Sequence, residues 1–178
     1  MHIELLMFKQ EDIGRLLSWV DSKELLLSWA GSFFEFPLSQ MQCEQYLETS
    51  LVEPPSRLIF KAVDSDSGEV VGHIELDGID LENQSAFISR VLVGANAQRG
   101  RGIGQAIVLQ LVNAAFTQLA LHRIAVGVLD FNDSAIYCYE KCGFKYEGRY
   151  RDIVKCGDQY YSVVTMSLLR SEWQSAEK

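Results

Sequence analysis

Gln98-Arg99-Gly100-Arg101-Gly102-Ile103-Gly104 is the stretch that decides the fold of this chain. Residues 87–93 before it have the composition of a strand, and residues 105–119 after it contain no Pro or Gly and predict a helix. Together these elements form a phosphate-binding arrangement, because glycines let the backbone come close and the first helical N–H groups lack helical partners. Arg99 and Arg101 add two positive charges there, in a chain whose formal net charge is -8.

Two common nucleotide-binding motifs do not fit this turn. A P-loop requires Lys and then Ser or Thr after its second glycine, whereas Gly104 is followed by Gln105-Ala106. A dinucleotide fingerprint that starts at Gly100 would need glycine at position 105 and an acidic residue roughly twenty positions on, where residues 119–123 offer none. A turn that only packs is an alternative, although two arginines around three glycines exceed what packing requires.

The residues before the turn predict several strands and two helices. Residues 57–63 and 70–76 flank a segment dense in turn residues and predict an antiparallel hairpin, to which the strand before the glycine turn adds a third member. A short strand is predicted at residues 3–6. Helices are predicted at residues 13–20, from apolar residues at helical spacing, and at residues 39–47, where Ser39 is the N-cap.

The residues after the turn complete the sheet. Residues 123–129 alternate β-branched and small side chains and predict a buried strand. A strand, helix and strand of this length imply a parallel pair and a right-handed crossover. Asn132-Asp133-Ser134 then caps a helix over residues 135–141, and two further strands follow at residues 145–154 and 160–169.

The composition is that of a single globular domain. The 178 residues are 48% hydrophobic and 22% charged, and they are too few for two well-buried domains. We therefore predict one α/β domain over residues 1–178, with a central mixed sheet of about seven strands flanked by about four helices. No apolar run approaches the ~20 residues of a membrane span, and residues 1–4 lack a signal-peptide pattern, so a cytoplasmic location is expected.

Charge and cysteine content narrow the range of partners. The acidic balance argues against a nucleic-acid backbone as a partner and is compatible with an amine-bearing substrate. The four cysteines do not have the spacing of metal ligands, so we expect reduced thiols and no metal site: Cys43, Cys138, Cys142 and Cys156.

Two motifs together resemble one family. Arg99-x-x-Gly102-x-Gly104 after a strand resembles the acyl-CoA pyrophosphate loop of the GNAT N-acetyltransferases. Asn132-Asp133-Ser134-Ala135-Ile136-x-x-Tyr139-Glu140-Lys141-x-Gly143-Phe144 resembles that family's other cofactor segment, in the same order and spacing. The tail from Gly148 to Leu168 is similar to the subgroup of ribosomal-protein N-terminal and spermidine acetyltransferases. The resemblance spans most of the chain and is weakest over residues 25–60.

The resemblance implies an acyl-CoA site. In the family, the strands on either side of the glycine turn and its helix splay apart, here the fourth and fifth, and the pantetheine arm inserts between them as a further strand. Asn132 matches the position that contacts this arm, with Ser134 nearby, although both residues also suit a helix N-cap. The expected cofactor-binding residues lie on the strand, the turn and the second segment: Val91, Leu92, Val93, Gln98, Arg99, Gly100, Arg101, Gly102, Ile103, Gly104, Asn132, Ser134 and Tyr139.

The resemblance also indicates how the chemistry is divided. Tyr139 matches the family's general acid, which protonates the departing CoA thiolate; a tyrosine buried in the core is the alternative. The strand before the turn has Arg90 and no carboxylate, so the general base must come from elsewhere. Glu75 on the preceding strand is the preferred base, acting through water, unless it is an ordinary solvent-facing carboxylate; His73 and Asp77 are the fallbacks.

We therefore expect an N-acetyltransferase that moves an acetyl group from acetyl-CoA to a primary amine by direct transfer in a ternary complex, without a metal. The expected acceptor is a protein N-terminus or a small amine, and Trp29, Phe33 and Phe36 are candidates to line its pocket. The alternatives are a non-catalytic acyl-CoA sensor, an aminoglycoside or polyamine acetyltransferase, and a nucleotide-binding protein. Neither a nucleic-acid nor a membrane partner is expected, and a homodimer is compatible with the family.

Overall fold

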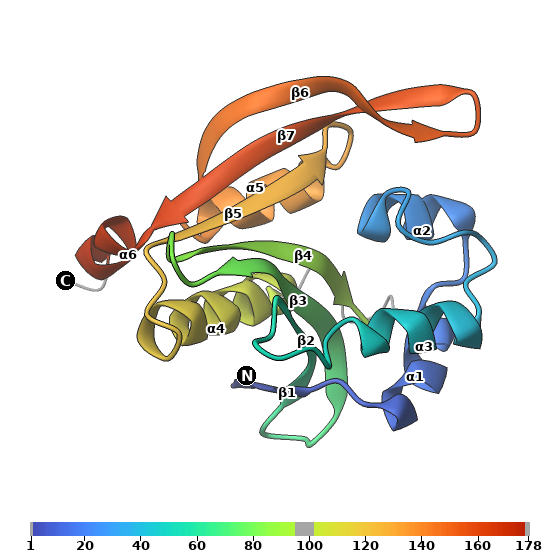
Figure 1. The fold of residues 1–178 in the computed structure, drawn as a ribbon, viewed down its shortest axis with the longest axis horizontal. Coiled ribbons are helices and arrows are strands. Elements are labelled where there is room, and N and C mark those ends of the chain that lie inside the picture. Colours follow the sequence, from blue (N-terminus) through green and yellow to red (C-terminus); the bar gives the residue numbers. More distant parts are fainter. Residues whose placement is uncertain (1, 95–101, 177–178) are drawn as a thin grey trace.

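The computed structural model describes residues 2–94 and 102–176, and its centre is one seven-stranded sheet (Figure 1). The strand order is β1-β2-β3-β4-β5-β7-β6. Neighbouring strands are antiparallel except β4 and β5, which run parallel and are connected through α4. The strands are β1 (Ile3–Met7), β2 (Arg57–Asp64), β3 (Val70–Asp80), β4 (Ser85–Val93), β5 (Arg123–Leu129), β6 (Lys145–Cys156) and β7 (Gln159–Leu169).

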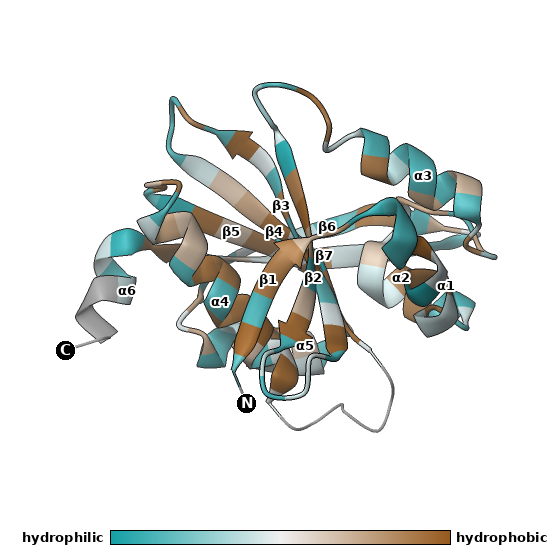
Figure 2. Cartoon of the chain, turned by 90° about the horizontal axis from the view of Figure 1, so that it is seen from below, coloured by the Kyte–Doolittle hydropathy of each residue, from teal (hydrophilic) through white to brown (hydrophobic). Residues whose placement is uncertain are grey.

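Helices flank this sheet on both faces. In Figure 1, α4 and α5 lie against the middle of the sheet, and α1, α2 and α3 gather beyond the end of β4. Along α4, hydrophobic and hydrophilic residues alternate as expected for a helix with one face on a sheet (Figure 2). The helices in the described part of the chain are the short 3-10 helix η1 (Gln10–Asp12), α1 (Ile13–Trp19), α2 (Lys23–Ala30), α3 (Gln40–Glu48), α4 (Ile103–Thr117), α5 (Asp133–Lys141) and α6 (Arg170–Ala176).

Strand β3 shows how the sheet separates two cores. Ile74 and Leu76 are buried in the larger core, which α4 completes. His73 and Glu75 alternate with them and hydrogen-bond Tyr46 of α3 on the opposite face. Successive side chains of a strand point to opposite faces. The core under α4 is therefore apolar, while the core under α3 contains polar and charged groups.

The predicted mixed sheet and its predicted helices are confirmed. The structure adds α2 and α6, which the sequence analysis did not assign. Their sequences carry no clear helical spacing, because the apolar residues of α2 are consecutive at Leu25, Leu26 and Leu27 and α6 has a single large apolar residue, Trp173. Helix α2 begins where Ser22 Oγ accepts a hydrogen bond from Leu25 N (3.3 Å), and α6 is fixed by a hydrogen bond from Leu169 N to Glu172 Oε2 (3.0 Å).

The expected splay between the fourth and fifth strands is present. Parallel pairing of β4 with β5 runs from Ser85 opposite Arg123 to Ile88 opposite Val126, and no pair follows in the described residues. On its other side, β4 contains a bulge, because its register with β3 shifts between Ser89 and Leu92. Arg90 has a positive φ of 49° at this bulge, which redirects its side chain and bends the strand.

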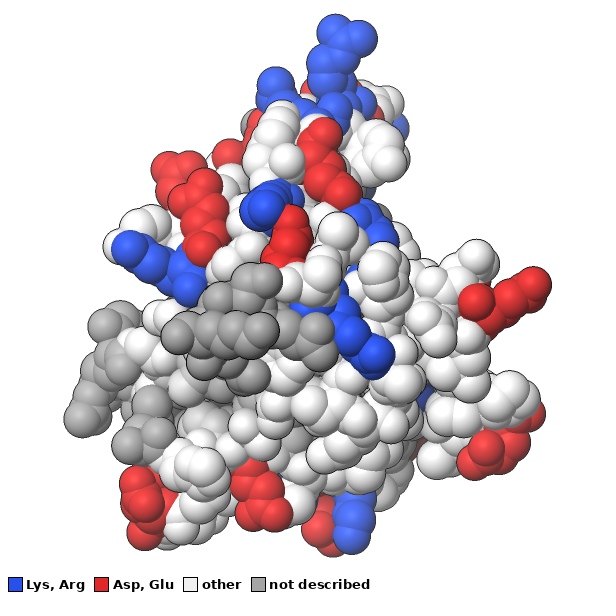
Figure 3. Space-filling model, turned by 90° about the vertical axis from the view of Figure 1, so that its left-hand side faces the viewer, with Lys and Arg blue, Asp and Glu red and all other residues white. Residues whose placement is uncertain are grey.

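The part of the chain that the structure describes has no membrane-spanning helix, no metal-binding group and no disulfide. None of the described helices is long and apolar enough to cross a membrane. In the described ranges, no group of three or more His, Cys, Asp or Glu residues could hold a metal ion, and the four cysteines are free thiols. Acidic and basic side chains are interspersed on the face shown in Figure 3, rather than gathered into a patch of one sign.

Candidate active site

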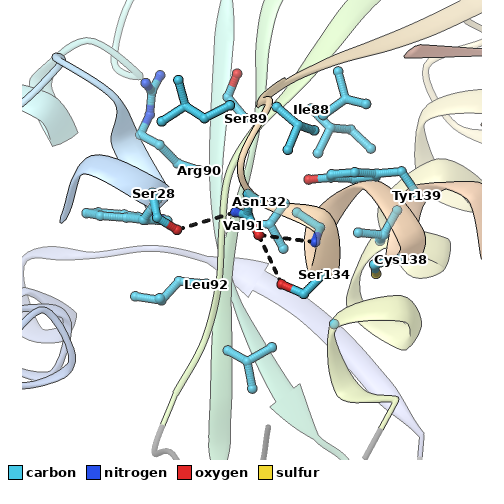
Figure 4. Close-up of a pocket in the computed structure, with 18 of the residues that line it drawn as sticks. Ser28, Ile88, Ser89, Arg90, Val91, Leu92, Asn132, Ser134, Cys138 and Tyr139 are labelled. Atoms are coloured by element: carbon cyan, nitrogen blue, oxygen red, sulfur yellow. Dashed lines mark hydrogen bonds between the residues drawn. The ribbon is translucent and has the colours of Figure 1, made fainter. Parts of the chain in front are cut away.

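The parting of β4 and β5 opens a cleft of about 730 Å³ (Figure 4). Strand β4 forms one wall and β5 the other, and the N-terminus of α4 and the inner side of α5 close it on one side. Helix α2 faces α5 across the cleft, and Val154 of β6 and Val163 of β7 also reach it. Elements far apart in the sequence therefore meet around one space of the size that a small-molecule site has.

In the wall formed by β4, the backbone N–H and C=O groups pair with a neighbouring strand on one side only. Val91, Leu92 and Val93 line the cleft. Leu92 and Val93 pair with β3, but the pairing of β4 with β5 has already ended at Ile88. The free edge offers N–H and C=O groups to a ligand that lies along it as an extra strand. This matches the place predicted for the pantetheine arm, and cofactor binding by these residues stays a prediction.

The N-terminus of α4 is built to receive an anion. Gly102 is its N-cap, with a left-handed φ of 79° and no side chain to cap the helix, and the first turn contains no acidic residue. A Cβ added at Gly104 would lie 3.5 Å from Val93 Cγ2 and 3.8 Å from Cys138 Sγ, which are ordinary contacts. Gly102, Ile103 and Gly104 all line the cleft. The predicted residues Gln98, Arg99, Gly100 and Arg101 lie outside the described residues.

Asn132 lies at the start of α5 and joins it to α2 (Figure 4). Its Oδ1 accepts hydrogen bonds from Ala135 N (3.2 Å) and from Ser134 Oγ (2.9 Å), so it is an N-cap, as the sequence suggested. Its Nδ2 donates to Ser28 Oγ of α2 (3.3 Å), a contact that spans the cleft. Asn132, Ser134 and Ser28 all line the cleft. The N-cap and a contact with a bound ligand are therefore compatible.

Tyr139 points into the cleft from α5 (Figure 4). The residue is buried, and its ring packs edge-on against Phe144 with the centroids 5.6 Å apart. Burial raises the pKa of the Tyr139 hydroxyl well above its ordinary value, and the neighbouring Cys138 and Cys142 thiols contribute. The hydroxyl is thus protonated at neutral pH, which is the state that a general acid needs.

Glu75 is fully buried behind the cleft wall, and the structure does not make it a solvent-facing carboxylate. Arg90 donates to both of its oxygens, from Nε and Nη2, at 2.5 Å each, and Tyr46 Oη donates to Oε2 at 2.5 Å. Arg57 adds an ion pair, with Nε 2.9 Å from Oε1. Arg90 lines the cleft, whereas Glu75 is not among the described residues that do.

The two fallback bases are also engaged. His73 is fully buried, and its burial, followed by the positive charge of Arg90, lowers its pKa to about 3. It is therefore neutral, with Nε2 at 3.1 Å from Tyr46 Oη. Asp77 accepts hydrogen bonds from Arg57 Nε (3.0 Å) and from Arg90 Nη2 (3.3 Å). The candidate bases thus belong to one charge network in which Arg90 is nearest the cleft.

The three aromatic candidates have different positions. Trp29 is buried and lines the cleft, with its ring stacked on Phe34 at a centroid distance of 5.6 Å. Phe33 lies over the guanidinium group of Arg90, whose Cζ is 4.1 Å from the ring centroid. Phe36 is exposed and is not one of the described cleft residues. Trp29 therefore belongs to the cleft itself, and Phe33 to the support of its wall.

Sequence reasoning missed several cleft residues. Ser28, Gln105, Cys138 and Lys141 line the cleft together with those predicted cofactor-binding residues that the structure describes. Gln105 Nε2 donates to Lys141 O (3.5 Å), which brings the end of α5 beside the start of α4. Lys141 lies inside the motif quoted above, and its place in that motif is the signal that could have identified it. Its ammonium group lies over the Tyr137 ring, with Nζ 5.1 Å from the ring centroid. Ser28 lies in no motif of this kind, because only the folded structure places α2 close to α5.

The fold and the cleft define a class of protein. A mixed sheet that splays at a parallel pair, with unpaired strand backbone beside a glycine-led helix N-terminus, is the architecture of acyl-CoA-dependent N-acyltransferases. The chain belongs to the acetyltransferase (GNAT) family, whose sequence profile matches residues 23–144. It is accordingly an N-acetyltransferase, in a family that uses acetyl-CoA.

Individual relatives agree with this assignment. An uncharacterised N-acetyltransferase of the SPbeta prophage of Bacillus subtilis is 29% identical over 78% of this chain and 76% of its own length. A B. subtilis protein with the provisional name ribosomal N-acetyltransferase is 26% identical over 97% of this chain and 94% of its own. The crystal structure of a Vibrio cholerae spermidine N-acetyltransferase with CoA and spermine has a TM-score of 0.83, at 22% identity over 97% and 98% of the two chains, and shows the same fold.

Proposed function

We propose that this enzyme transfers an acetyl group from acetyl-CoA directly to a primary amine in a ternary complex. The observation that carries the proposal is that one cleft contains the free edge of β4, the uncapped N-terminus of α4 and the Tyr139 hydroxyl. The space continues between α2 and α5. A cofactor arm that lies along β4 and an acceptor that lies beside α2 would therefore meet in this cleft. The acetyl group would pass directly from one to the other, without an acyl-enzyme intermediate.

Acetyl-CoA would bind along the cleft in two parts. The pyrophosphate accepts hydrogen bonds from the first-turn amides of α4, at Ile103 and Gly104, because these N–H groups have no helical partner. Gln98 to Arg101 would extend that turn, and Lys141 would add a positive charge beside it. The pantetheine arm would run along Val91 to Val93 and pass Asn132 and Ser134.

The transfer step follows from the same geometry. The amine nitrogen bonds to the thioester carbonyl carbon, and the carbon–sulfur bond breaks as the amine gives up a proton to water. A backbone N–H near Leu92 or Val93 stabilises the negative charge that develops on the carbonyl oxygen. Tyr139 gives its proton to the departing thiolate and regains one from water. An ordinary thiol has a pKa near 8.5, so protonation makes it a better leaving group.

The role that we propose for Glu75 is to position Arg90, and not to take the proton itself. Its oxygens already accept hydrogen bonds from Arg90 and Tyr46, and it is fully buried. Protonating it would leave the guanidinium groups of Arg90 and Arg57 without their counter-charge, which is costly in a buried site. The proton would therefore leave the amine through water in the cleft.

A change of Tyr139 to Phe tests the proposal. Removing the proton donor should lower kcat by about a hundredfold with little change in the KM for acetyl-CoA, since general acids contribute rates of that order. Release of CoA thiol is followed in the presence of a panel of peptides, polyamines and aminoglycosides. Tyr150→Phe, at an exposed position of β6, is the control. An unaltered kcat for Tyr139→Phe would remove Tyr139 from the mechanism.

A second candidate is a non-catalytic acyl-CoA sensor, and it is favoured by the absence of Asp or Glu among the described cleft residues. The sensor predicts that CoA stabilises the protein while no amine in the panel causes thiol release. A homodimer and a cytoplasmic location remain predictions of the sequence; light scattering on the purified protein tests the first.

A further inference from the structure

We propose that Cys138 is a thiol modification site inside the cofactor cleft, and that a small disulfide that reacts with it closes the cleft to acetyl-CoA. This role rests on the proposed acetyl transfer, and it adds a means by which the redox state of the surroundings controls that reaction. Three features of the cleft lead to it: the exposure of Cys138 to the cleft, its place at the positive end of α4, and a second thiol one helical turn away.

Cys138 is accessible from the cleft. Of the four thiols, all of which the structure describes, it alone lines the cleft. Figure 4 shows it on the wall formed by α5, beside Tyr139. The residue is partly exposed, whereas Cys43 and Cys142 are buried. Cys156 is also partly exposed, but it lies at the end of β6 and is not a cleft residue. A reagent that enters the cleft therefore meets one thiol, that of Cys138.

The first turn of α4 favours the charged form of this thiol. A Cβ built at Gly104 would lie 3.8 Å from Cys138 Sγ, so the sulfur lies directly against the start of the helix. The N–H groups there lack helical partners and form the positive end of the helix dipole, and the first turn contains no acidic residue. Thiols at helix N-termini have lower pKa values than ordinary thiols and react as thiolates. Cys138 is therefore placed to act as a nucleophile.

Cys142 supports this thiolate from the next turn of α5. Its thiol hydrogen-bonds Cys138, and this bond is the main reason that the pKa of Cys138 falls below its ordinary value, although burial opposes the fall. The same bond, together with burial, raises the pKa of Cys142, which stays a thiol. Cys142 Sγ also lies 3.8 Å from Gln105 O, so both thiols pack against the first turn of α4. An accessible thiolate beside a second thiol is the arrangement of redox-sensitive cysteines.

The reaction is a thiol–disulfide exchange. The Cys138 thiolate attacks one sulfur of a small disulfide, the sulfur–sulfur bond of the reagent breaks, and a new bond joins Cys138 to half of it. The other half leaves as a thiolate and takes a proton from water, so Cys138 is oxidised and that half is reduced. Because Gly104 is so close to the Cys138 sulfur, the added group has to extend into the cleft. There it occupies the place proposed for acetyl-CoA beside α4.

The first test measures the alkylation rate of each cysteine by mass spectrometry, with a limiting amount of iodoacetamide at pH 7. We expect Cys138 to react about threefold faster than Cys156, or more, because a larger fraction of it is thiolate. Acetyl-CoA, which has no free thiol, leaves about a tenth of the clefts empty at about ten times its dissociation constant. It should then slow Cys138 about tenfold and leave Cys156 unchanged. Equal rates for the two cysteines, or equal protection of both, would contradict the assignment of the site.

Two variants of Cys142 isolate its support of the thiolate. Cys142→Ala removes the hydrogen-bond donor and should slow the alkylation of Cys138 about threefold, the effect of one weak hydrogen bond. Cys142→Ser keeps a hydroxyl donor and should recover most of the rate. Since both variants lose the same buried sulfur, a change in packing alone would affect them alike. Equal rates at Cys138 in the two variants would therefore overturn the role of Cys142.

The last test asks whether the modification closes the cleft. Protein treated with oxidised glutathione should gain one glutathione at Cys138 and lose the increase in Tm that acetyl-CoA gives the untreated protein. Reduction with dithiothreitol should restore that increase, and Cys138→Ala should keep its own increase after the same treatment. A modified protein whose Tm still rises with acetyl-CoA would overturn the inference. If acetyl-CoA raises the Tm of neither form, the proposed function fails, and the alkylation rates still decide whether Cys138 is a reactive site.

Discussion

At the scale of single residues, His73 is held in an environment that excludes its charged form. Its ring packs edge-on against Phe8 and Trp29, at centroid distances of 5.0 and 5.8 Å. Nε2 lies 3.1 Å from Tyr46 Oη, and Nδ1 has no partner among the described residues. Burial is the main reason that its pKa falls to about 3, the positive Arg90 adds to the effect, and Asp12 opposes it.

This environment predicts a loss of stability in mild acid. An unfolded His has a pKa near 6.5, so between pH 6.5 and about 3 the unfolded chain binds a proton that the folded chain does not. The free energy of unfolding should thus fall as the pH drops from 7 to 5, by roughly 2 kcal/mol from this residue. His73→Gln keeps a hydrogen-bond donor for Tyr46 Oη but does not titrate. In urea unfolding at the two pH values, this variant should lose the share of the pH dependence that comes from His73. His122→Gln, at an exposed site, should keep it; equal slopes in all three proteins would contradict the prediction.

Residues whose role depends on local sequence could be predicted, and those whose role depends on distant partners could not. The N-cap at Asn132 was predicted because capping is a property of three or four consecutive residues. His73 and Glu75 are two residues apart, so the strand period of two puts both on one face of β3, where they meet Tyr46. That pattern does not say whether the face is solvent or α3, and so the ion pairs of Glu75 with Arg57 and Arg90 were unforeseen.

At the scale of elements, one hydrogen bond joins α2 to α5 across the cleft. Asn132 Nδ2 donates to Ser28 Oγ at 3.3 Å, while Asn132 Oδ1 caps its own helix (Figure 4). Helix α2 packs in the core under α3, and α5 packs in the core under α4. The bond therefore connects the two sides of the molecule at the position where the pantetheine arm is proposed to pass.

We predict that Ser28 orients Asn132 for acetyl-CoA. Ser28→Ala removes the acceptor of the Asn132 amide and should raise the KM for acetyl-CoA about three- to tenfold, as expected for one hydrogen bond, with kcat unchanged. Ser28→Thr retains the hydroxyl and should restore the lower KM. The control is Ser18→Ala, whose hydroxyl donates only within α1, to Arg15 O at 2.7 Å. A fall in kcat without a change in KM would show that Ser28 serves a different step.

The elements themselves were predictable to different degrees. The strands and four of the described helices, α1, α3, α4 and α5, carry patterns of spacing or capping of their own, and the sequence predicted them. Helix α2 was not predicted because its apolar residues Leu25, Leu26 and Leu27 are consecutive and show no helical spacing, and α6 has a single large apolar residue, Trp173. The insertion of β7 between β5 and β6 is a property of strand pairing, with Arg123 opposite Leu169 through Leu129 opposite Val163, and no local pattern encodes that choice of partner.

At the scale of the whole molecule, the cleft lies where the two cores meet. Leu92 belongs to the core under α3, whereas Ile88, earlier on the same strand, belongs to the core under α4. A ligand that lies along β4 and reaches the N-terminus of α4 would contact elements of both cores. Binding should then stabilise the fold as a unit, because a ligand that binds only the folded state adds to its free energy of unfolding.

The last prediction concerns this coupling. CoA at about a hundred times its dissociation constant should add roughly 2.7 kcal/mol to the free energy of unfolding, and should raise Tm by about 5–10 °C for a chain of this size. ATP shares the diphosphate but lacks the pantetheine arm, so it should shift Tm less at the same concentration. Lys141→Gln removes a cation from a residue that lines the cleft and should reduce the CoA shift, most clearly at low salt.

Lys155→Gln is its control, because Lys155 lies over the Tyr160 ring on the β6–β7 hairpin, and the described cleft residues do not include it. Its CoA shift should equal that of the unchanged protein. Equal Tm shifts from ATP and CoA would mean that the free edge of β4 contributes nothing to binding. The glycine turn would then be a general nucleotide site, and the assignment of the arm to Val91–Val93 would have to be withdrawn even though the family assignment stands.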